Sequence, residues 1–505
     1  MLIHSHILPY PFWLRGWVLL QKKFKMDTIR RISKNLFFQS TSEIIVKGLQ
    51  ILIFIYIARF LRETEFGKFN FAIAFTAIAL IFIDIGLRPL FIREISRKRE
   101  IAEKYIFHSI IIKSVLSVIV FLIVIFFMNL IGYPQDIRIL VYIMFAAIIL
   151  KSFTDVFSTV FLAFEQMQWD GLFKTLRAVL LTILVFSVLF MGQGIIIIAW
   201  MYVITELFIL ALCLFVLFTK FIKLVVKVEK GFIKKLSFEA FPFALTVLFY
   251  SLYFYISSIM LLKMRGVYDV GIFSAAYNIT TAFIFIPTIY ITAIFPTLSK
   301  FYINSKDSLK FAYKKSLLYI SIIALPITIV LFFLGDNIIH FLYGAGYHNS
   351  AFVLKIIAIT ILLRFISFVN GVTIISINKQ KQRLYFQGAT AFLNIILNFI
   401  LIPLFGLIGV AFATIISEFF LNASYFFIVI NYFKNWKDIL ILIKPFIAVI
   451  VASSLFFVGI DTIWVILMVL ISYVALLLIF KVFNKEDLNI FKRVSQVLFL
   501  RKRNF

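Results

Sequence analysis

The sequence predicts an all-α polytopic membrane protein with about 14 transmembrane helices, and three observations support this prediction. Of the 505 residues, 63% are hydrophobic and only 14% are charged, whereas a soluble domain is roughly 45–50% apolar and about 25% charged. The apolar residues form long runs, and a helix needs about 20 of them to cross a bilayer. Basic residues collect in alternate breaks between the runs. A soluble enzyme is therefore excluded.

The expected helices follow one another along the chain as apolar runs separated by polar or Gly- and Pro-containing breaks. They are 36–60, 69–92, 107–131, 138–163, 172–191, 194–218, 238–262, 271–298, 316–342, 351–376, 384–404, 406–430, 438–459 and 463–482. The pairs that meet near Gly194 and Gly406 are the easiest to miscount. Residues 1–25 hold no complete span, so they are either an extension before a start at Met26 or an interfacial segment.

The basic residues give an orientation. Fifty Lys and Arg against 23 Asp and Glu leave a formal charge of +27, which in a soluble chain would suggest nucleic acid. Of the fifty, 37 fall in alternate segments on one side, 5 in the opposite loops and 8 inside the spans. Cytoplasmic loops collect Lys and Arg, so both termini are expected in the cytoplasm. The opposite loops are too short for a catalytic domain.

An internal repeat divides the chain. Glu65-Phe-Gly-Lys-Phe69 returns as Asp269-Val-Gly-Ile-Phe273, and Thr205-Glu206 returns as Ser417-Glu418. Six spans separate the copies, so both halves face the same way, with a substrate site expected between them. The expected units are a cytoplasmic segment 1–35, an N-lobe 36–218, a basic cytoplasmic linker 219–237, a C-lobe 238–430, two extra helices in 431–482 and a basic cytoplasmic tail 483–505.

No feature of the sequence predicts a metal or a cofactor. Cys213 is the single cysteine, which excludes an intrachain disulfide. Neither a C-x-x-C nor an H-E-x-x-H motif is present, and glycine-rich phosphate loops are absent.

Several motifs resemble a known family. They include IARFLRETEFGKF after the first span, FLYGAGY (Phe341 to Tyr347) and LNIILNFILIPLFGLIGVAFATIISE (Leu393 to Glu418). They are similar to the polysaccharide transporter family, which contains the repeat-unit flippases of O-antigen and capsule synthesis. That family lies within the multidrug/oligosaccharidyl-lipid/polysaccharide exporter superfamily. One departure is Ser257 or Ser258, where many relatives carry an acidic residue.

The resemblance implies a two-lobed, V-shaped bundle that works by alternating access. It implies a flippase, not an enzyme, that moves a polyprenyl-pyrophosphate-linked oligosaccharide of O-antigen, capsule or exopolysaccharide synthesis across a prokaryotic cytoplasmic membrane. The expected partners are this lipid-linked glycan, membrane lipid and other polysaccharide-synthesis membrane proteins, with no nucleic acid and a monomeric state. The glycan, the carrier length and the coupling ion stay open.

Charged residues deep in the expected spans are candidates for the site. A charge at mid-membrane costs about 2.5–3.5 kcal/mol on insertion scales, so it is turned inward or paired. The candidates for a cationic substrate path are Lys47, Arg88, Lys113, Lys151 and Arg364. The candidates for pairing or coupling are Glu43, Asp84, Asp155, Glu206 and Glu418.

Alternative roles stay open for these residues. Three i,i+4 pairs either neutralise themselves or open to substrate: Glu43–Lys47, Asp84–Arg88 and Lys151–Asp155. Lys113 either snorkels or binds. Arg364 has no acidic neighbour within a turn, which favours bidentate phosphate contact, but pairing with a Glu of another helix is an equal alternative. Tyr250, Tyr253 and Tyr255 either stack on sugars or pack against lipid.

Two other functions compete with the flippase. A cation-coupled drug or metabolite exporter would share the fold but would need more acidic and fewer basic groups in its cavity. A membrane polymerase, ligase or glycosyltransferase would need a long outer loop carrying Arg, His or acidic groups, and no such loop is present in the sequence.

Overall fold

The computed structural model describes residues 12–221, 230–434, 440–458 and 462–483. These residues form helices joined by turns, without a strand, and twelve of the helices are long and apolar enough to cross a membrane. The predicted all-α membrane protein is confirmed. Residues 222–229 of the expected basic linker and nearly all of the basic tail lie outside the described residues.

The first two expected spans form one continuous element, α1 (Phe12–Asp84), which folds back on itself. Its backbone is non-helical at Arg62, with φ 62° and ψ −178°. The rings of Phe54 and Phe69 lie 6.0 Å apart, although a straight helix would separate them by about 22 Å. The chain therefore turns back at Arg62 into two antiparallel limbs. Counting both limbs and the shorter helix Trp464–Ile479 would give the expected number, so the count of fourteen crossings stays a prediction.

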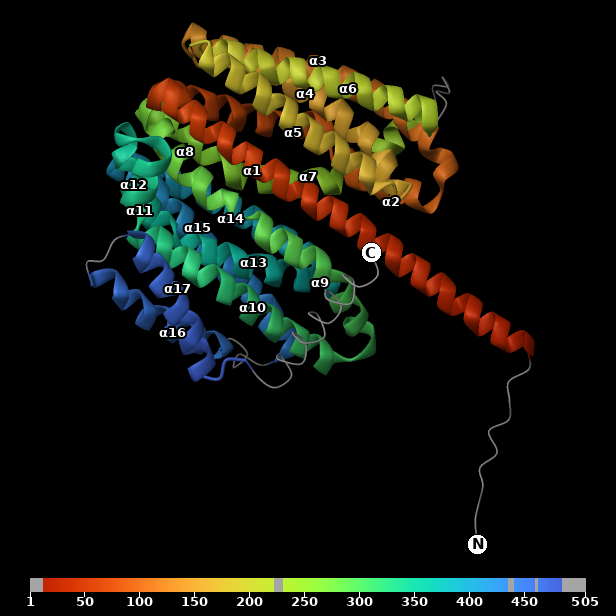
Figure 1. Ribbon diagram of the computed structural model, residues 1–505. Helices are drawn as coiled ribbons and strands as arrows, with labels where there is room; N and C mark the ends of the chain where they lie inside the picture. The colour runs from red at the N-terminus through yellow and green to blue at the C-terminus, as the bar shows by residue number, and fades with distance from the viewer. Residues whose placement is uncertain (1–11, 222–229, 435–439, 459–461, 484–505) are drawn as a thin grey trace.

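The first lobe is built from α1 and the five helices that follow it (Figure 1). These are α2 (Leu87–Arg97), α3 (Ala102–Leu130), α4 (Gln135–Ala163), α5 (Met167–Phe190) and α6 (Ile195–Lys220). Helix α4 packs along α6, and α1 packs along α5. We call this unit the N-lobe.

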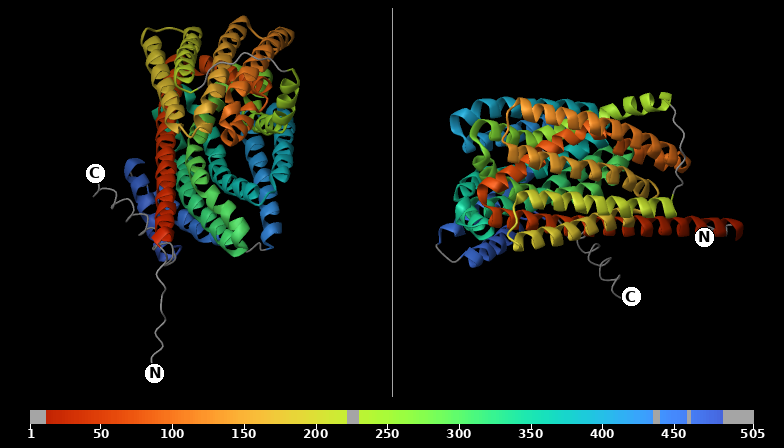
Figure 2. Two further views of the ribbon diagram at one scale, coloured as in Figure 1. Left: turned by 90° about the vertical axis from the view of Figure 1, so that its right-hand side faces the viewer. Right: turned by 90° about the horizontal axis from the view of Figure 1, so that it is seen from above.

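The helices that follow are α7 (Lys230–Arg265), which connects the two lobes, and the helices of the second lobe. The latter are α8 (Val267–Ala282), α9 (Phe285–Asn304), α10 (Lys306–Phe333), α11 (Gly335–Tyr343), α12 (His348–Ile357), α13 (Ile359–Ser376), α14 (Gln380–Phe405) and α15 (Leu407–Phe433). The appended α16 (Ile443–Ser453) and α17 (Thr462–Ile479) pack against α10. We call α8 to α15 the C-lobe; Figure 2 shows it below the N-lobe in its left view.

Turns at equivalent places support the internal repeat. Arg62 and Gly266, 204 residues apart, share a positive φ and an extended ψ, with values of 62° and −178° against 99° and 179°. Glu165 and Asn378, 213 residues apart, end α4 and α13 with φ of 62° and 60°. A non-glycine residue rarely takes a positive φ. Its recurrence at the repeat spacing therefore indicates that the two halves share one chain path.

The lobes touch through a symmetrical helix crossing. A Cβ on Gly67 would overlap the carbonyl oxygen of Val267, and a Cβ on Gly271 would overlap the carbonyl oxygen of Glu63. Glu63 and Val267 are related by the same offset of 204 as Gly67 and Gly271. Small residues allow two membrane helices to approach this closely. The axis that relates the lobes therefore passes between the second limb of α1 and α8.

Further contacts close the same end of the molecule. Arg59 Nη2 donates to the carbonyl of Phe341 at 2.5 Å, and Tyr347 Oη donates to the carbonyl of Ala58 at 3.0 Å. Burial and the nearby Glu63 raise the pKa of Tyr347, so its hydroxyl remains a donor. Figure 1 shows the lobes meeting near α8, α11 and α12 and diverging toward the other end. We call these the closed end and the open end.

Helix α7 connects the lobes at the open end. Its first turns pack on α2, where Leu236 and Ala240 are buried in the N-lobe core and Arg93 lies 3.8 Å from Glu239. Its later turns pack along α14. Residues 230–237, expected in a linker, therefore belong to a helix.

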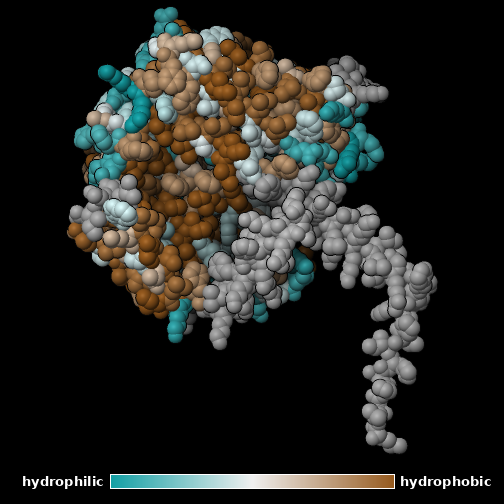
Figure 3. Space-filling model, viewed as in Figure 1, coloured by the Kyte–Doolittle hydropathy of each residue, from teal (hydrophilic) through white to brown (hydrophobic). Residues whose placement is uncertain are grey.

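The surface matches a protein surrounded by lipid. Figure 3 shows a broad apolar band over both lobes, with hydrophilic side chains gathered toward the two ends. Large exposed side chains such as Phe126, Phe399 and Leu404 are each more than half exposed. Such patches would be unusual in a soluble monomer, and they support a membrane environment.

The glycine crossing gives a first prediction. Gly67→Ala or Gly271→Ala adds one methyl group that must displace the opposite backbone, so each should cost about 1–3 kcal/mol of stability. Melting temperatures of the detergent-solubilised protein measure this cost. Gly48→Ala is the matched control, because its Cβ would meet open space. Equal melting temperatures for Gly67→Ala and Gly48→Ala would refute the role of the crossing.

Candidate functional site

Three neighbouring chambers lie within and between the lobes and share lining residues. The middle chamber, about 370 Å³, is lined by α1, α7, α8 and α9. The N-lobe chamber, about 570 Å³, is lined by α1, α4, α5, α6 and α7. The C-lobe chamber, about 180 Å³, lies among α7, α13, α14 and α15. Tyr250 of α7 lines all three chambers, so α7 is the wall that they share.

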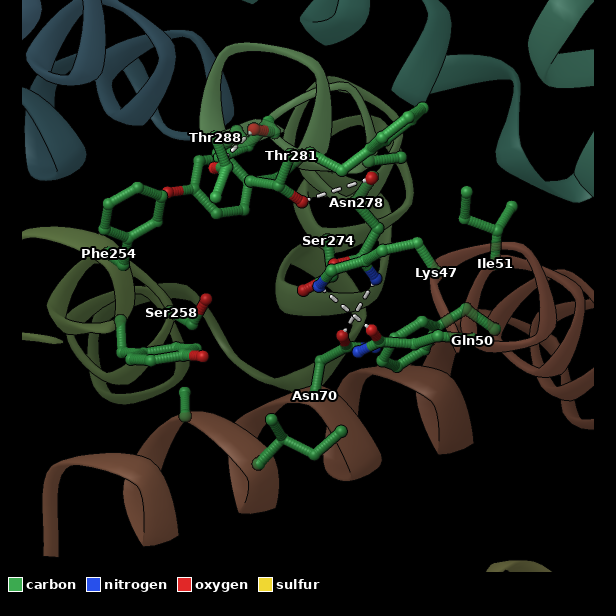
Figure 4. Close-up of a pocket in the computed structure, with 18 of the residues that line it drawn as sticks. Lys47, Gln50, Ile51, Asn70, Phe254, Ser258, Ser274, Asn278, Thr281 and Thr288 are labelled. Atoms are coloured by element: carbon green, nitrogen blue, oxygen red, sulfur yellow. Dashed lines mark hydrogen bonds between the residues drawn. The ribbon is translucent and has the colours of Figure 1, made fainter. Parts of the chain in front are cut away.

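The middle chamber is polar and lies below the closed end. Asn278 of α8 donates to Asn70 Oδ1 at 3.1 Å across the lobes, which closes the chamber on that side (Figure 4). Ser258, Ser274 and Thr281 add hydroxyl groups. Amide and hydroxyl groups offer both donors and acceptors, so this chamber can solvate a polar ligand inside the membrane.

Lys47 reaches the middle chamber without a carboxylate partner. Its Nζ donates to Gln50 Oε1 at 3.2 Å and makes no ion pair with any residue that the structure describes. The expected Glu43–Lys47 pair is wrong, because Glu43 lies 3.2 Å from Lys174 of α5 instead. Glu43 still lines the same chamber as Lys47 and attracts it without direct contact. Lys47 therefore presents a positive charge to the cavity that no direct ion pair within the described residues holds.

The N-lobe chamber is walled by a chain of ion pairs. Lys151 pairs with Asp155 at 3.3 Å, as the sequence predicted. Arg177 lies 4.0 Å from Asp155 and 3.1 Å from Glu206, which links α4, α5 and α6. Lys151 keeps 40% of its side chain exposed. The chain is close to neutral overall, yet Lys151, Lys174 and Arg177 all line the chamber.

A second chain of ion pairs runs toward the open end. Lys174 bridges Glu43 and Asp170, at 3.2 and 2.9 Å. Asp170 also lies 3.8 Å from Arg88. Arg88 lines none of the three chambers, so the structure places this candidate outside the cavity.

The expected Asp84–Arg88 pair is also wrong, and the backbone explains why. Helix α1 ends at Asp84, and Ile85 and Gly86 take positive φ of 40° and 71° before α2 begins. The i,i+4 relation requires one continuous helix. Asp84 instead pairs with Lys113 of α3, and the Ser152 hydroxyl donates to Asp84 at 3.1 Å. Lys113 is fully buried in the N-lobe and does not reach the cavity.

Arg364 is held by its own lobe. Its Nε donates to Glu418 Oε1 of α15 at 2.5 Å, and its Nη2 donates to the Tyr277 hydroxyl at 3.2 Å. The rings of Phe254 and Tyr277 lie 5.0 and 5.1 Å from the guanidinium. Of the two alternatives left open by the sequence, the structure has the contact with a glutamate. The charge of Arg364 is thus already neutralised.

Sequence reasoning missed several residues that line the cavity. Lys174 and Arg177 were counted with the basic cytoplasmic segment 164–177, although both lie on α5, which begins at Met167, and both line the N-lobe chamber. Gln50, Asn70 and Asn278 gave no signal, since single polar residues in apolar runs are common, and Arg383 lies in a polar loop of the sequence. Tyr250 and Tyr255 face the cavity, although lipid packing was the open alternative.

Ser257, one of the two serines at the position where many relatives carry an acidic residue, belongs to a network of uncharged side chains. Ser257 donates to Asn394 Oδ1 at 3.4 Å and accepts from Asn398 Nδ2 at 3.0 Å. Asn394 also donates to Ser417 Oγ at 3.1 Å. These polar groups bind one another without a carboxylate, and Asn398 Oδ1 alone among them is left without a partner in the described residues. Within the described part of the chain, no three His, Cys, Asp or Glu residues are grouped to hold a metal ion.

Comparison with protein families gives the affiliation of the chain. The family model for "Polysaccharide biosynthesis protein" matches residues 32–302, which is more than half of the sequence. The chain belongs to this family. A second family model, MatE, matches residues 242–400.

Individual relatives agree with the family. The capsular polysaccharide biosynthesis protein CapF of Staphylococcus aureus is 24% identical over 401 residues, covering 78% of this chain and 98% of CapF. In fold, the chain is similar to the lipid II flippase MurJ in an inward closed conformation, with a TM-score of 0.73 and 18% identity over 88% of this chain and 99% of MurJ.

The fold is also similar to an inward-facing multidrug resistance MATE family transporter of the MOP superfamily. The TM-score is 0.66 and the identity 15%, over 76% of this chain and 94% of the transporter. The family member described here therefore has the fold of MOP-superfamily transporters.

The buried Lys113 pair gives a second prediction. Lys113→Met leaves Asp84 without its partner, and breaking a buried pair costs about 3–5 kcal/mol, so the amount of folded protein should fall. The double variant Lys113→Met/Asp84→Asn should recover it. Size-exclusion chromatography of the solubilised protein measures the folded fraction. If the double variant stays as poorly folded as the single one, the pair is not what Lys113 contributes.

Proposed function

We propose that the protein is a flippase for a polyprenyl-pyrophosphate-linked oligosaccharide in the cytoplasmic membrane. Membership of the polysaccharide biosynthesis protein family supports this proposal. The similarity to CapF supports a capsule-type glycan as cargo. The observation that carries the proposal is the charge of Lys47, which lines a chamber between the two lobes and makes no direct ion pair with a described residue.

The chemistry of the cavity fits such a substrate. The polyprenyl tail can remain in the bilayer, whereas the pyrophosphate and the sugars need a polar path. Lys47 offers a positive charge to the pyrophosphate, and Lys151, Lys174 and Arg177 stand on the adjoining wall. Arg and Lys are the side chains that bind phosphate groups. The hydroxyl and amide groups of the middle chamber suit sugar hydroxyls.

The direction of transport follows from the arrangement that we propose. The closed end faces outward and the open end faces the cytoplasm, where the lipid-linked glycan is made. An inside-negative potential favours outward movement of an anion by about 2.3 kcal/mol per charge per 100 mV. Exposing the cavity outward would then require the lobes to separate at the Gly67–Gly271 crossing and to approach each other at the open end.

A cation-coupled exporter of drugs or metabolites is the second candidate. The MatE match over residues 242–400 and the MATE-like fold favour it. Such an exporter needs acidic groups free to bind its cargo or coupling ion. The carboxylates of Asp155, Glu206 and Glu418 are instead engaged by basic side chains, which favours an anionic cargo.

The role of Lys47 gives a third prediction. Lys47→Met should abolish surface glycan and accumulate lipid-linked repeat units in a flippase-null strain, because the middle chamber loses its one lining cation among the described residues. The amount of folded protein should not change, since Lys47 leaves no carboxylate behind. Adding Glu43→Gln should not restore export, because Glu43 pairs with Lys174. Full export by Lys47→Met would overturn the proposed contact, and altered drug resistance with normal glycan would favour the exporter.

The orientation gives a fourth prediction. In a Cys213→Ser background, cysteines at Asp269 and His348 should react with a membrane-impermeant maleimide added to intact cells. A cysteine at Lys310 should react only after the membrane is opened. The buried Cys213 is removed so that each labelled site is unique. Reversed labelling of two of these sites would reject the orientation.

A further inference from the structure

The C-lobe chamber contains unsatisfied buried polar groups that the pyrophosphate path does not use. Arg364 is 2% exposed and Gln387 is 7% exposed. Arg364 Nη1 and Gln387 Oε1 have no hydrogen-bond partner among the described residues, and both side chains line the chamber. A buried polar atom without a partner costs about 1–3 kcal/mol. Such atoms therefore point to a ligand or to water that completes them.

The two groups are of opposite kinds. Arg364 Nη1 is a donor, and Gln387 Oε1 is an acceptor. Arg364 cannot swing away, because Glu418 and Tyr277 hold its other nitrogens and two aromatic rings flank it. The free donor is therefore fixed in place before any ligand arrives.

The remaining lining offers aromatic surface and another donor. Tyr250, Phe254, Phe368 and Tyr425 contribute rings, and Arg383 lies beside Tyr425. A sugar hydroxyl both donates and accepts, and the apolar faces of a sugar ring pack on aromatic rings. A phosphate only accepts, and it would meet Gln387 Oε1 and the carboxylate of Glu418. The N-lobe chamber differs because three basic side chains line it beside the one carboxylate of Glu206, whereas here two arginines line the chamber with Glu418.

Size and access agree with this chemistry. A volume of about 180 Å³ equals about six waters at the roughly 30 Å³ each occupies in the liquid, which is room for one sugar ring and not for an oligosaccharide. Tyr250 and Phe254, whose rings lie 4.5 Å apart, line both this chamber and the middle chamber. They form the partition through which a sugar would enter.

We propose that the C-lobe chamber is a specificity subsite that binds one neutral sugar ring of the substrate, while the N-lobe side binds the pyrophosphate. This inference rests on the proposed flippase function and deepens it, because it divides substrate recognition between the two lobes. Arg364 then serves as a fixed hydrogen-bond donor to a sugar hydroxyl and not as a counter-ion for phosphate.

Saturation-transfer NMR on the full-length protein in nanodiscs tests the subsite. The probes are the methyl glycosides of a neutral hexose, an N-acetylhexosamine and a hexuronate, with inorganic pyrophosphate as competitor. Wild type should transfer saturation to a neutral glycoside more strongly than to the hexuronate, and pyrophosphate should not displace it. No transfer to any neutral glycoside, or displacement by pyrophosphate, would overturn the subsite.

Two variants locate the binding. Gln387→Met removes the unpartnered acceptor, and Tyr253→Phe removes a hydroxyl beside Glu418. Each should weaken glycoside binding about fivefold to tenfold, the equivalent of one hydrogen bond. The matched controls are Gln382→Met, exposed on the same helix, and Tyr473→Phe, whose hydroxyl contacts α10. Both controls should bind as wild type does.

The outcomes separate the two proposals. A chamber that holds only water predicts that Gln387→Met binds as wild type does and melts at the same or a higher temperature, because an unpartnered buried atom has been removed. That result overturns the subsite. Pyrophosphate binding that is lost in Lys47→Met but retained in Gln387→Met keeps the flippase proposal intact. Pyrophosphate binding that no N-lobe cation affects would overturn the flippase proposal instead.

Discussion

Neutralisation of charge inside the bilayer is the constraint on which the rest of this structure depends. An unpaired charge in a membrane helix is costly, and the membrane helices of this protein contain many charged residues. In the N-lobe the ion pairs run between helices, so α1, α4, α5 and α6 are joined by Glu43–Lys174 and by Asp155–Arg177–Glu206. The charges therefore also fix the helix arrangement. Lys47 differs from these residues because it makes no direct ion pair with a described residue, so its charge can still contact an anionic ligand.

Much of the fold could be predicted because it follows from composition and period. Apolar runs located the helices, and the offset of 204 between Gly67 and Gly271 located the repeat. The local backbone geometry could not be predicted from the sequence. The positive φ at Ile85 ends α1, and no propensity marks an isoleucine for that conformation. The pair expected between Asp84 and Arg88 failed with it, since a helical spacing has no meaning across a break.

The candidate site was predicted by residue type more than by partner. The sequence left pairing and substrate contact open for the deep charges, and of the three expected i,i+4 pairs the described residues contain Lys151–Asp155. Glu43, Asp84 and Arg364 pair with residues on other helices, and a single sequence holds no record of such packing. The middle chamber escaped prediction altogether. Asn70 and Asn278 meet only because the lobes cross at the glycines, more than 200 residues apart in the chain.

The two halves carry a basic residue at equivalent positions of the repeat, but its surroundings differ between the lobes. Lys151 and Arg364 are 213 residues apart, close to the offset of 212 between Glu206 and Glu418. In the N-lobe this position is 40% exposed and faces the larger chamber. In the C-lobe it is buried, and its charge is cancelled by Glu418. A symmetrical pair of cationic walls would hold an anion from both sides and oppose its release. Under the division of the substrate proposed above, an asymmetric pair would let one lobe attract the anionic group while the other contacts the uncharged part.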